Sequence, residues 1–177
     1  MIKFLQIPDN EKRRIYQDMS NKLGLPPQAI EKDMWVTLIL RMIFSSEHAN
    51  YFIFKGGTSL SKAFSLIDRF SEDIDLGIDR KYLGFEDELS GGEIRKLRTA
   101  CHTYVTNELI EILRNRLTEY GVDSNLYELI VENTQISDQD PETIKVNYKS
   151  LYEEVSYLSP RILIEVCTQH FLIMRKF

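Results

Sequence analysis

The spacing of apolar residues predicts a helical beginning to the chain. A thin stripe of apolar residues about one turn apart predicts a helix over residues 9–23, ending at Gly24. A denser stripe predicts a longer helix over residues 28–44. Trp35 lies inside this second helix, and we expect it to be a core or lid residue rather than a platform for base stacking.

The second half of the chain combines one long helical pattern with strand patterns. Apolar residues three or four apart predict a helix over residues 93–120. Strands are predicted over residues 126–132 and 143–149, joined by a turn at 138–141, and over residues 161–166. The predicted fold class is therefore α+β, a mixed sheet flanked by helices.

Residues 51–79 combine strand patterns with a helical pattern. An apolar run at 51–54 predicts a buried strand, and the adjacent glycines Gly56 and Gly57 interrupt it. Because glycine has no Cβ atom, the backbone there can adopt a positive φ and a ligand can approach it closely. At 73–76 the pattern changes to a polar/apolar alternation, which predicts a second strand.

The segment between these two strands predicts a helix. Thr58 or Ser59 can cap it, and its apolar positions recur at Leu60, Phe64 and Ile67, about one turn apart. Free backbone N–H groups at such a helix start suit an anionic phosphate group.

Two acidic residues share a face of the second strand. Asp73 and Asp75 alternate with apolar neighbours, so their side chains point the same way. Side-by-side carboxylates repel each other and are stabilised by a divalent cation such as Mg²⁺ or Mn²⁺. Mg²⁺ is usually bound by one or two carboxylates together with substrate phosphates. The stretch therefore predicts a site for a nucleoside triphosphate (NTP) and its metal ion.

A third acid lies in the last predicted strand. Glu165 has apolar neighbours and shares a face with Arg161 and Leu163. A carboxylate in such surroundings needs a partner. That partner is either the metal site at the two aspartates or an ion pair with Arg161.

Other side chains around the glycines also have two interpretations. Lys55 can neutralise phosphate charge or be a solvated lysine at a strand end. Ser59 can contact a phosphate as well as cap the helix. Arg69 can pair with Glu72 or with Asp73 and so fix the loop before the second strand.

Two strings carry a family resemblance. Lys-Gly-Gly-Thr-Ser-Leu-Ser-Lys, starting at Lys55, and Arg-Phe-Ser-Glu-Asp-Ile-Asp-Leu, starting at Arg69, resemble the AbiEii/AbiGii toxin family. That family belongs to the polymerase-β-like nucleotidyltransferase superfamily, whose signature is a glycine pair, a helix and then Asp-x-Asp. The resemblance is dense over residues 54–76 and implies a polymerase-β-like core.

The resemblance also implies a function and a set of site residues. It implies a metal-dependent nucleotidyltransferase toxin of a type IV toxin–antitoxin or phage-abortive system, acting on tRNA or another hydroxyl acceptor. The nucleotide loses pyrophosphate when its α-phosphate is attacked by the acceptor hydroxyl. The implied catalytic residues are Asp73, Asp75 and Glu165, of which the two aspartates bind the metal ion. The implied nucleotide-binding residues are Lys55, Gly56, Gly57, Thr58, Ser59 and Arg69.

Composition sets wider limits. The 177 residues fit one compact domain, with a helical segment at 1–50 packed on a nucleotidyltransferase core at 51–177. The net charge of −5 excludes a generally basic nucleic-acid binder, so RNA contact requires a local patch. Arginines and lysines on the predicted 93–120 helix are either such a track or an ordinary solvated face.

The remaining features concern location and assembly. No run reaches membrane-spanning length, and two separated cysteines indicate neither zinc nor disulfides, so a reduced cytoplasm is expected. Members of the family continue into a helical C-terminal region with a basic and acidic motif that this sequence does not match. We therefore keep two alternatives to an active toxin: an inactive or shortened form that binds nucleotide or a partner protein such as an antitoxin, and an interaction module without ligand. Uncovered apolar surface in a shortened form predicts a homo-oligomer or a protein complex.

Overall fold

A computed structural model describes residues 2–62, 73–86, 88–153 and 158–168. Within these ranges, five strands form one mixed sheet in the order β1-β2-β5-β4-β3. The β2–β5 pair is parallel, and the other three pairs are antiparallel. The strands are β1 (Phe52–Lys55), β2 (Ile74–Ile78), β3 (Tyr127–Val131), β4 (Glu142–Tyr148) and β5 (Arg161–Cys167).

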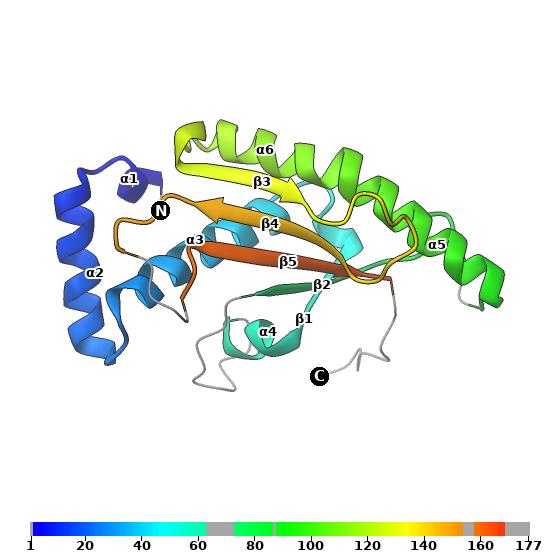
Figure 1. Ribbon diagram of the computed structural model, residues 1–177, viewed down its shortest axis with the longest axis horizontal. Helices are drawn as coiled ribbons and strands as arrows, with labels where there is room; N and C mark the ends of the chain where they lie inside the picture. Colours follow the sequence, from blue (N-terminus) through cyan, green and yellow to red (C-terminus); the bar gives the residue numbers. More distant parts are fainter. Residues whose placement is uncertain (1, 63–72, 87, 154–157, 169–177) are drawn as a thin grey trace.

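Helices cover one face of this sheet and one end of it (Figure 1). The long helices α3, α5 and α6 pack on the apolar face, whereas α4 contacts β1 and β2. The helices are α1 (Ile2–Leu5), α2 (Asp9–Leu23), α3 (Pro27–Phe44), α4 (Gly56–Lys62), α5 (Gly91–Tyr104) and α6 (Ile110–Glu119). Short 3₁₀ turns lie at Ala49–Tyr51 and Ser124–Leu126. The α+β class predicted from the sequence is confirmed.

Strand alternation divides the sheet into an apolar and a polar face. In β5, the side chains of Ile162, Ile164 and Val166 are fully buried, whereas Leu163 and Glu165 are half-buried on the other side. Strands β2 and β4 show the same alternation of buried and half-buried positions. The apolar face therefore forms the core, and the half-buried side chains lie on the opposite face.

The two N-terminal helices end close to where the sequence predicts. Helix α2 ends at Leu23 because Gly24 adopts a left-handed φ of 68° and donates its N–H to the Ser20 carbonyl. Helix α3 starts at Pro27, one residue before the predicted position. Trp35 is 3% exposed and stacks on Tyr148, with ring centroids 5.2 Å apart, so its interpretation as a core residue is confirmed.

Helices α5 and α6 form one helical body, as the apolar spacing predicts. It begins two residues earlier than expected because Ser90 and Glu93 form a reciprocal capping box before Gly91. A π-helical turn at Val105–Leu109 separates its two α-helical parts. Such a turn inserts one extra residue and rotates the side chains that follow it.

Buried charged residues connect α3 to the segments around β5. Glu31 is 2% exposed; its carboxylate accepts the Leu151 N–H at 2.9 Å and the Ser150 hydroxyl. Burial raises the pKa of Glu31, and these two hydrogen bonds act in the opposite direction. The neighbouring Lys32 ammonium donates to the Ser159 carbonyl at 3.2 Å, so α3 fixes the entry to β5.

Among the described residues, none of the helices combines the length and apolar character that crossing a membrane requires.

Candidate active site

Four strands bring polar side chains into one row across the sheet. Asp75 on β2 lies directly opposite Lys55 on β1 and directly opposite Glu165 on β5, which in turn lies opposite Thr143 on β4. Directly paired residues point to the same face, with Cβ atoms about 5 Å apart. The sheet thus brings together two acids that are distant in sequence and places a lysine beside them.

The glycine turn approaches this row at Asp75. Gly56 has a φ of 72°, and a Cβ atom added to it would lie 1.9 Å from Asp75 Oδ2 and 2.5 Å from its Cγ. A side chain at position 56 would therefore both strain the backbone and collide with the carboxylate. The bare peptide of the turn and the acid of β2 meet, which is the convergence that the sequence predicts.

Asp73 lies just before β2 and is exposed. Its backbone carbonyl accepts a hydrogen bond from the Thr58 hydroxyl, which connects the start of β2 to α4. Asp73 precedes Asp75 by two residues, and its charge acts on Glu165 together with that of Asp75. The three carboxylates predicted to form the site therefore lie in one electrostatic neighbourhood.

The pKa of Glu165 is raised, and its causes are burial and the charges around it. Burial raises it most, the negative charges of Asp75 and Asp73 raise it further, and the Lys55 ammonium lowers it. The cation acting on Glu165 is thus Lys55. Arg161, the alternative partner, is exposed and four residues away along β5, which is about 13 Å in a strand. The geometry does not support an Arg161 ion pair.

The prediction that Thr58 or Ser59 caps the helix is wrong. Helix α4 begins at Gly56, so both residues lie within its first turns. The Ser59 hydroxyl donates to the Gly56 carbonyl at 2.8 Å, and the Thr58 hydroxyl donates to the Asp73 carbonyl. Both residues are buried, at 1% and 4% exposed, and their hydroxyl groups connect the glycine turn to the start of β2.

The other predicted nucleotide-binding residues differ in position. Gly57 is half-buried in the first turn of α4, beside Gly56. Lys55 is half-buried at the end of β1, and its ammonium group donates to Cys167 Sγ. Arg69, like Phe64 and Ile67 of the predicted helix, lies outside the described residues.

The carboxylates provide the donor type that a divalent cation needs. In the ranges that the structure describes, no three His, Cys, Asp or Glu side chains are gathered closely enough to hold a metal ion. Because Mg²⁺ takes one or two carboxylates and completes its shell with phosphate oxygens and water, Asp73, Asp75 and Glu165 nevertheless fit it chemically.

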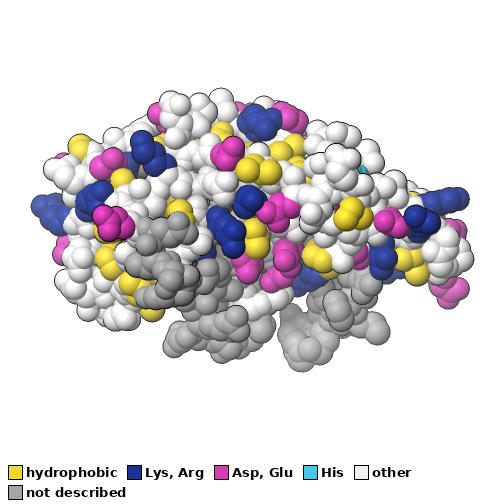
Figure 2. Space-filling view, in the orientation of Figure 1, with side chains coloured by type: hydrophobic (Ala, Val, Ile, Leu, Met, Phe, Trp, Pro, Cys, Tyr) yellow, Lys and Arg dark blue, Asp and Glu magenta, His cyan; other side chains and the backbone are white. Residues whose placement is uncertain are grey.

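Two residues on this face could not be found by sequence reasoning. Thr143 lies beside Glu165, and Cys167 follows Glu165 by two residues on the same side of β5. Strand alternation could show which way each points, but only the strand order shows that Cys167 comes within reach of Lys55. Figure 2 shows acidic and basic side chains side by side on the face of the molecule seen there.

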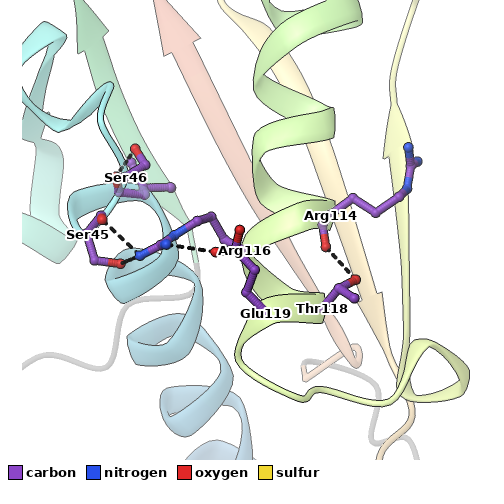
Figure 3. Close-up of polar contacts among 7 residues, drawn as sticks. Ser45, Ser46, Arg114, Arg116, Thr118 and Glu119 are labelled. Atoms are coloured by element: carbon purple, nitrogen blue, oxygen red, sulfur yellow. Dashed lines mark hydrogen bonds and ion pairs between the residues drawn. The ribbon is translucent and has the colours of Figure 1, made fainter.

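The arginines of α5 and α6 are mostly engaged with nearby acids. Arg95 pairs with Asp138 at 2.9 Å, and Arg114 pairs with Glu111. Figure 3 shows Arg116 turned toward the end of α3, where its guanidinium donates to the Ser45 carbonyl at 2.9 Å. The same guanidinium donates to Glu119 of its own helix at 2.8 Å.

An adjoining hollow of about 330 Å³ is lined by both Glu47 and Glu119, beside Arg116. Negative charge at this hollow opposes a nucleic-acid backbone. These contacts favour the interpretation of the helix as a solvated face over that of an RNA track.

A comparison with known protein families shows which family the chain belongs to. The profile described as nucleotidyl transferase AbiEii toxin, type IV TA system, matches residues 38–172. The chain belongs to the AbiEii family. The match begins inside α3 and includes all five described strands, and so contains the row from Lys55 to Glu165. No curated protein and no solved structure matches the chain significantly.

Proposed function

We propose that this AbiEii-family protein is a metal-dependent nucleotidyltransferase that transfers a nucleotide from an NTP to a hydroxyl acceptor and releases pyrophosphate. The observation that carries the proposal is the contact between Gly56 and Asp75, beside Glu165 on the next strand. A bare peptide and paired carboxylates in one place suit a triphosphate with its metal ion.

Each side chain then has a role set by its position. Asp73 and Asp75 would hold Mg²⁺ or Mn²⁺, whose charge would offset that of the triphosphate. The backbone of Gly56 and Gly57 admits the phosphates closely because no Cβ atom intervenes. Glu165 has the raised pKa and is the carboxylate suited to take the acceptor's proton on an Oε atom.

The family description supports more specific proposals about partners. A toxin of a type IV system implies an antitoxin, and we propose that the acceptor is tRNA or another RNA and that the protein acts in the cytoplasm. We also propose a homo-oligomer, because Ile15, Met19 and Leu23 form an exposed apolar stripe along α2. A monomer in light scattering at high concentration would contradict the oligomer.

A binding-only form is the second candidate. It is favoured by the spacing of the described carboxylates, which are not gathered into a three-ligand metal group. Such a protein would bind NTP, or only its partner protein, without transferring nucleotide.

The test compares wild type with Asp75→Asn. Titration calorimetry with each NTP, with and without Mg²⁺, measures binding, and labelled nucleotide with total tRNA measures transfer. We expect Asp75→Asn to abolish Mg²⁺-dependent binding and transfer, since it removes a metal ligand and its charge. Glu128→Gln is the matched control, because Glu128 lies at the far edge of the same face, bound to Asn147 at 3.0 Å.

The outcomes separate the candidates. Binding without transfer in the wild type supports the binding-only form, and absence of both supports an interaction module. Asp75→Asn with unchanged Mg²⁺-dependent binding would falsify the site assignment.

A further inference from the structure

A cavity of about 70 Å³ lies where the N-terminal helices meet the end of the sheet. Residues of α1, α2, α3 and the segment after β4 line it (Figure 1). Its apolar wall includes Leu5, Met34, Leu126 and Leu151. The described residues around it include none of those proposed to bind nucleotide or metal, so a ligand here would have a separate role.

Two buried aromatic side chains with polar groups line this cavity. Tyr16 on α2 and Trp35 on α3 are each 3% exposed. Among the residues that the structure describes, neither the Tyr16 hydroxyl nor the Trp35 indole N–H has a hydrogen-bond partner. Buried polar groups in folded proteins nearly always have such a partner. The cavity beside both side chains is a place where one can bind.

The acids at the cavity are already engaged. Asp9 pairs with the Lys12 ammonium group at 3.1 Å. Glu31 accepts the two hydrogen bonds described above, and the positive charge of Arg13 also acts on it. Lys149 is exposed at the cavity, and within the described ranges its ammonium group forms no ion pair. The groups left over are three hydrogen-bond donors, one of which is positively charged.

The volume of the cavity limits its occupant to a few atoms. A cavity of about 150 Å³ takes a benzene ring, and one water needs about 10–15 Å³. A volume of about 70 Å³ therefore suits several waters or a molecule of about four non-hydrogen atoms. Acetate has this size. Its two oxygens can accept hydrogen bonds from all three donors, and its methyl group can contact the apolar wall.

We propose that this cavity is a binding site for a carboxylate group of the size of acetate, held by the Tyr16 hydroxyl, the Trp35 indole N–H and the Lys149 ammonium group. The carboxylate is either a free anion or the end group of a larger molecule that extends past Lys149. A bound carboxylate connects α2 and α3 to the segment after β4 and stabilises the folded chain. This site does not depend on the proposed transferase activity.

The experiment uses Trp35 as its reporter. Trp35 is the single tryptophan of the chain, so its indole N–H gives one NMR signal from the cavity. Sodium acetate is titrated into the full chain, with sodium chloride at equal ionic strength as the reference. We expect a saturable shift of the signal, half complete at an acetate concentration on the order of 1 mM, because so small a ligand gains little binding free energy.

Two further ligands test the chemistry of the occupant. Acetamide has the shape of acetate without its charge, and we expect it to leave the Trp35 signal unchanged. N-acetylglycine carries its carboxylate on a longer body, so binding as tight as that of acetate indicates an end group, whereas weaker binding indicates a free anion. An acetate effect no larger than that of chloride, or an equal effect of acetamide, would overturn the proposal.

Two variants test the donors. Tyr16→Phe removes the hydroxyl but keeps the ring that packs edge-on against Phe4. We expect it to raise the half-saturating acetate concentration about three- to tenfold, the effect of one lost hydrogen bond. Lys149→Met should raise it about two- to fivefold. Because Lys149 is exposed, this second variant keeps the test valid even if Tyr16→Phe folds poorly.

Each variant has a matched control. Tyr104 is also 3% exposed, but its hydroxyl lies 3.2 Å from His48 Nδ1, so Tyr104→Phe should bind acetate as the wild type does. Lys145→Met removes a lysine that pairs with Glu132 at 2.9 Å, and it should also leave binding unchanged. Wild-type affinity in both Tyr16→Phe and Lys149→Met would overturn the assignment of the site. Equal weakening by Lys145→Met and Lys149→Met would do so too, because it would reflect net charge alone.

Discussion

Glu142 and Glu165 lie on neighbouring strands, and burial is the main cause of the raised pKa of each. Their surroundings differ. Glu142 begins β4 and pairs with Val166, while the next residue, Thr143, pairs with Glu165. Because successive residues of a strand point to opposite faces, the two carboxylates lie on different sides of one sheet.

On the helix-covered face, Glu142 is completely buried. One carboxylate oxygen is 3.2 Å from His102 Nδ1 on α5, and the other has no hydrogen-bond partner among the described residues. Burial raises its pKa most, Asp140 adds to the increase, and His102 opposes it. Within the described ranges, this buried acid therefore depends on His102 for its hydrogen bond.

On the open face, Glu165 is half-buried beside two aspartates and one lysine. Burial also raises its pKa most; the charges of Asp75 and Asp73 raise it further, and the Lys55 ammonium group lowers it. The comparison shows that burial raises the pKa of an acid on either face of the sheet, whatever lies around it. The identity of the charged neighbours, and access for a ligand, separate the two sites.

The largest expected effect comes from Gly56→Ala. The added methyl group would collide with Asp75. In addition, an alanine held at this positive φ costs roughly 1–3 kcal/mol by itself. We expect Mg²⁺-dependent NTP binding to fall below detection in calorimetry. Gly84→Ala is the control, since Gly84 has a φ of 85° and an added Cβ atom there would meet nothing within 4 Å. This variant should lose only the stability that the strained backbone costs and should still bind NTP.

The next prediction contrasts the two faces of β5. Ile164→Ala should lower the free energy of unfolding by about 2–5 kcal/mol because it leaves a cavity in the core. Leu163→Ala, one residue away on the polar face, should lower it by less than about 1.5 kcal/mol because the side chain is only half-buried. Urea denaturation measures both; equal losses would mean that the polar face is covered.

A smaller effect is expected from His102→Ala. Removing the donor leaves the buried Glu142 carboxylate without its partner, which should lower stability by about 1–3 kcal/mol at neutral pH. Because the pKa of Glu142 is already raised, the loss should shrink as the pH falls and the carboxyl group becomes protonated. His102→Asn, which keeps a donor, should recover part of the stability. A pH-independent loss would show that His102 contributes through packing.

The smallest effect is expected from Glu165→Gln in metal-free buffer. The folded pKa of Glu165 is above its unfolded value, so its ionisation disfavours the folded state once the pH exceeds the ordinary carboxyl range. The variant should therefore be more stable than wild type at neutral pH and equal to it in acid. Since the group is partly exposed, we expect a gain below about 1 kcal/mol, or a few degrees in Tm. A thermal melt series across pH measures it, and a destabilised variant at neutral pH would contradict the assignment.

Local patterns predicted much of this architecture. Alternation in residues 161–166 identified which side of β5 is buried, because a strand has only two sides. Gly24 marked the end of α2 because its backbone conformation is the one glycine favours. The glycine turn does lie against Asp75, and the role of both in a site stays a prediction.

Relations between distant segments could not be predicted in this way. The helix after the glycines starts at Gly56, and Thr58 and Ser59 do not cap it but donate to carbonyl groups, one of them on the segment before β2. Arg161 looked like a partner for Glu165 only while the neighbour of β5 was unknown. The Lys55–Cys167 contact and the Glu142–His102 contact both depend on the strand order, which no local pattern encodes.

The parallel pairing of β2 with β5 has a consequence for biosynthesis. Asp75 leaves the ribosome long before Glu165, and until β5 has been made, the edge of β2 has no strand to set that acid beside it. Contacts between such distant segments form late in folding. A nascent chain that lacks β5 therefore cannot yet place Glu165 beside Asp75.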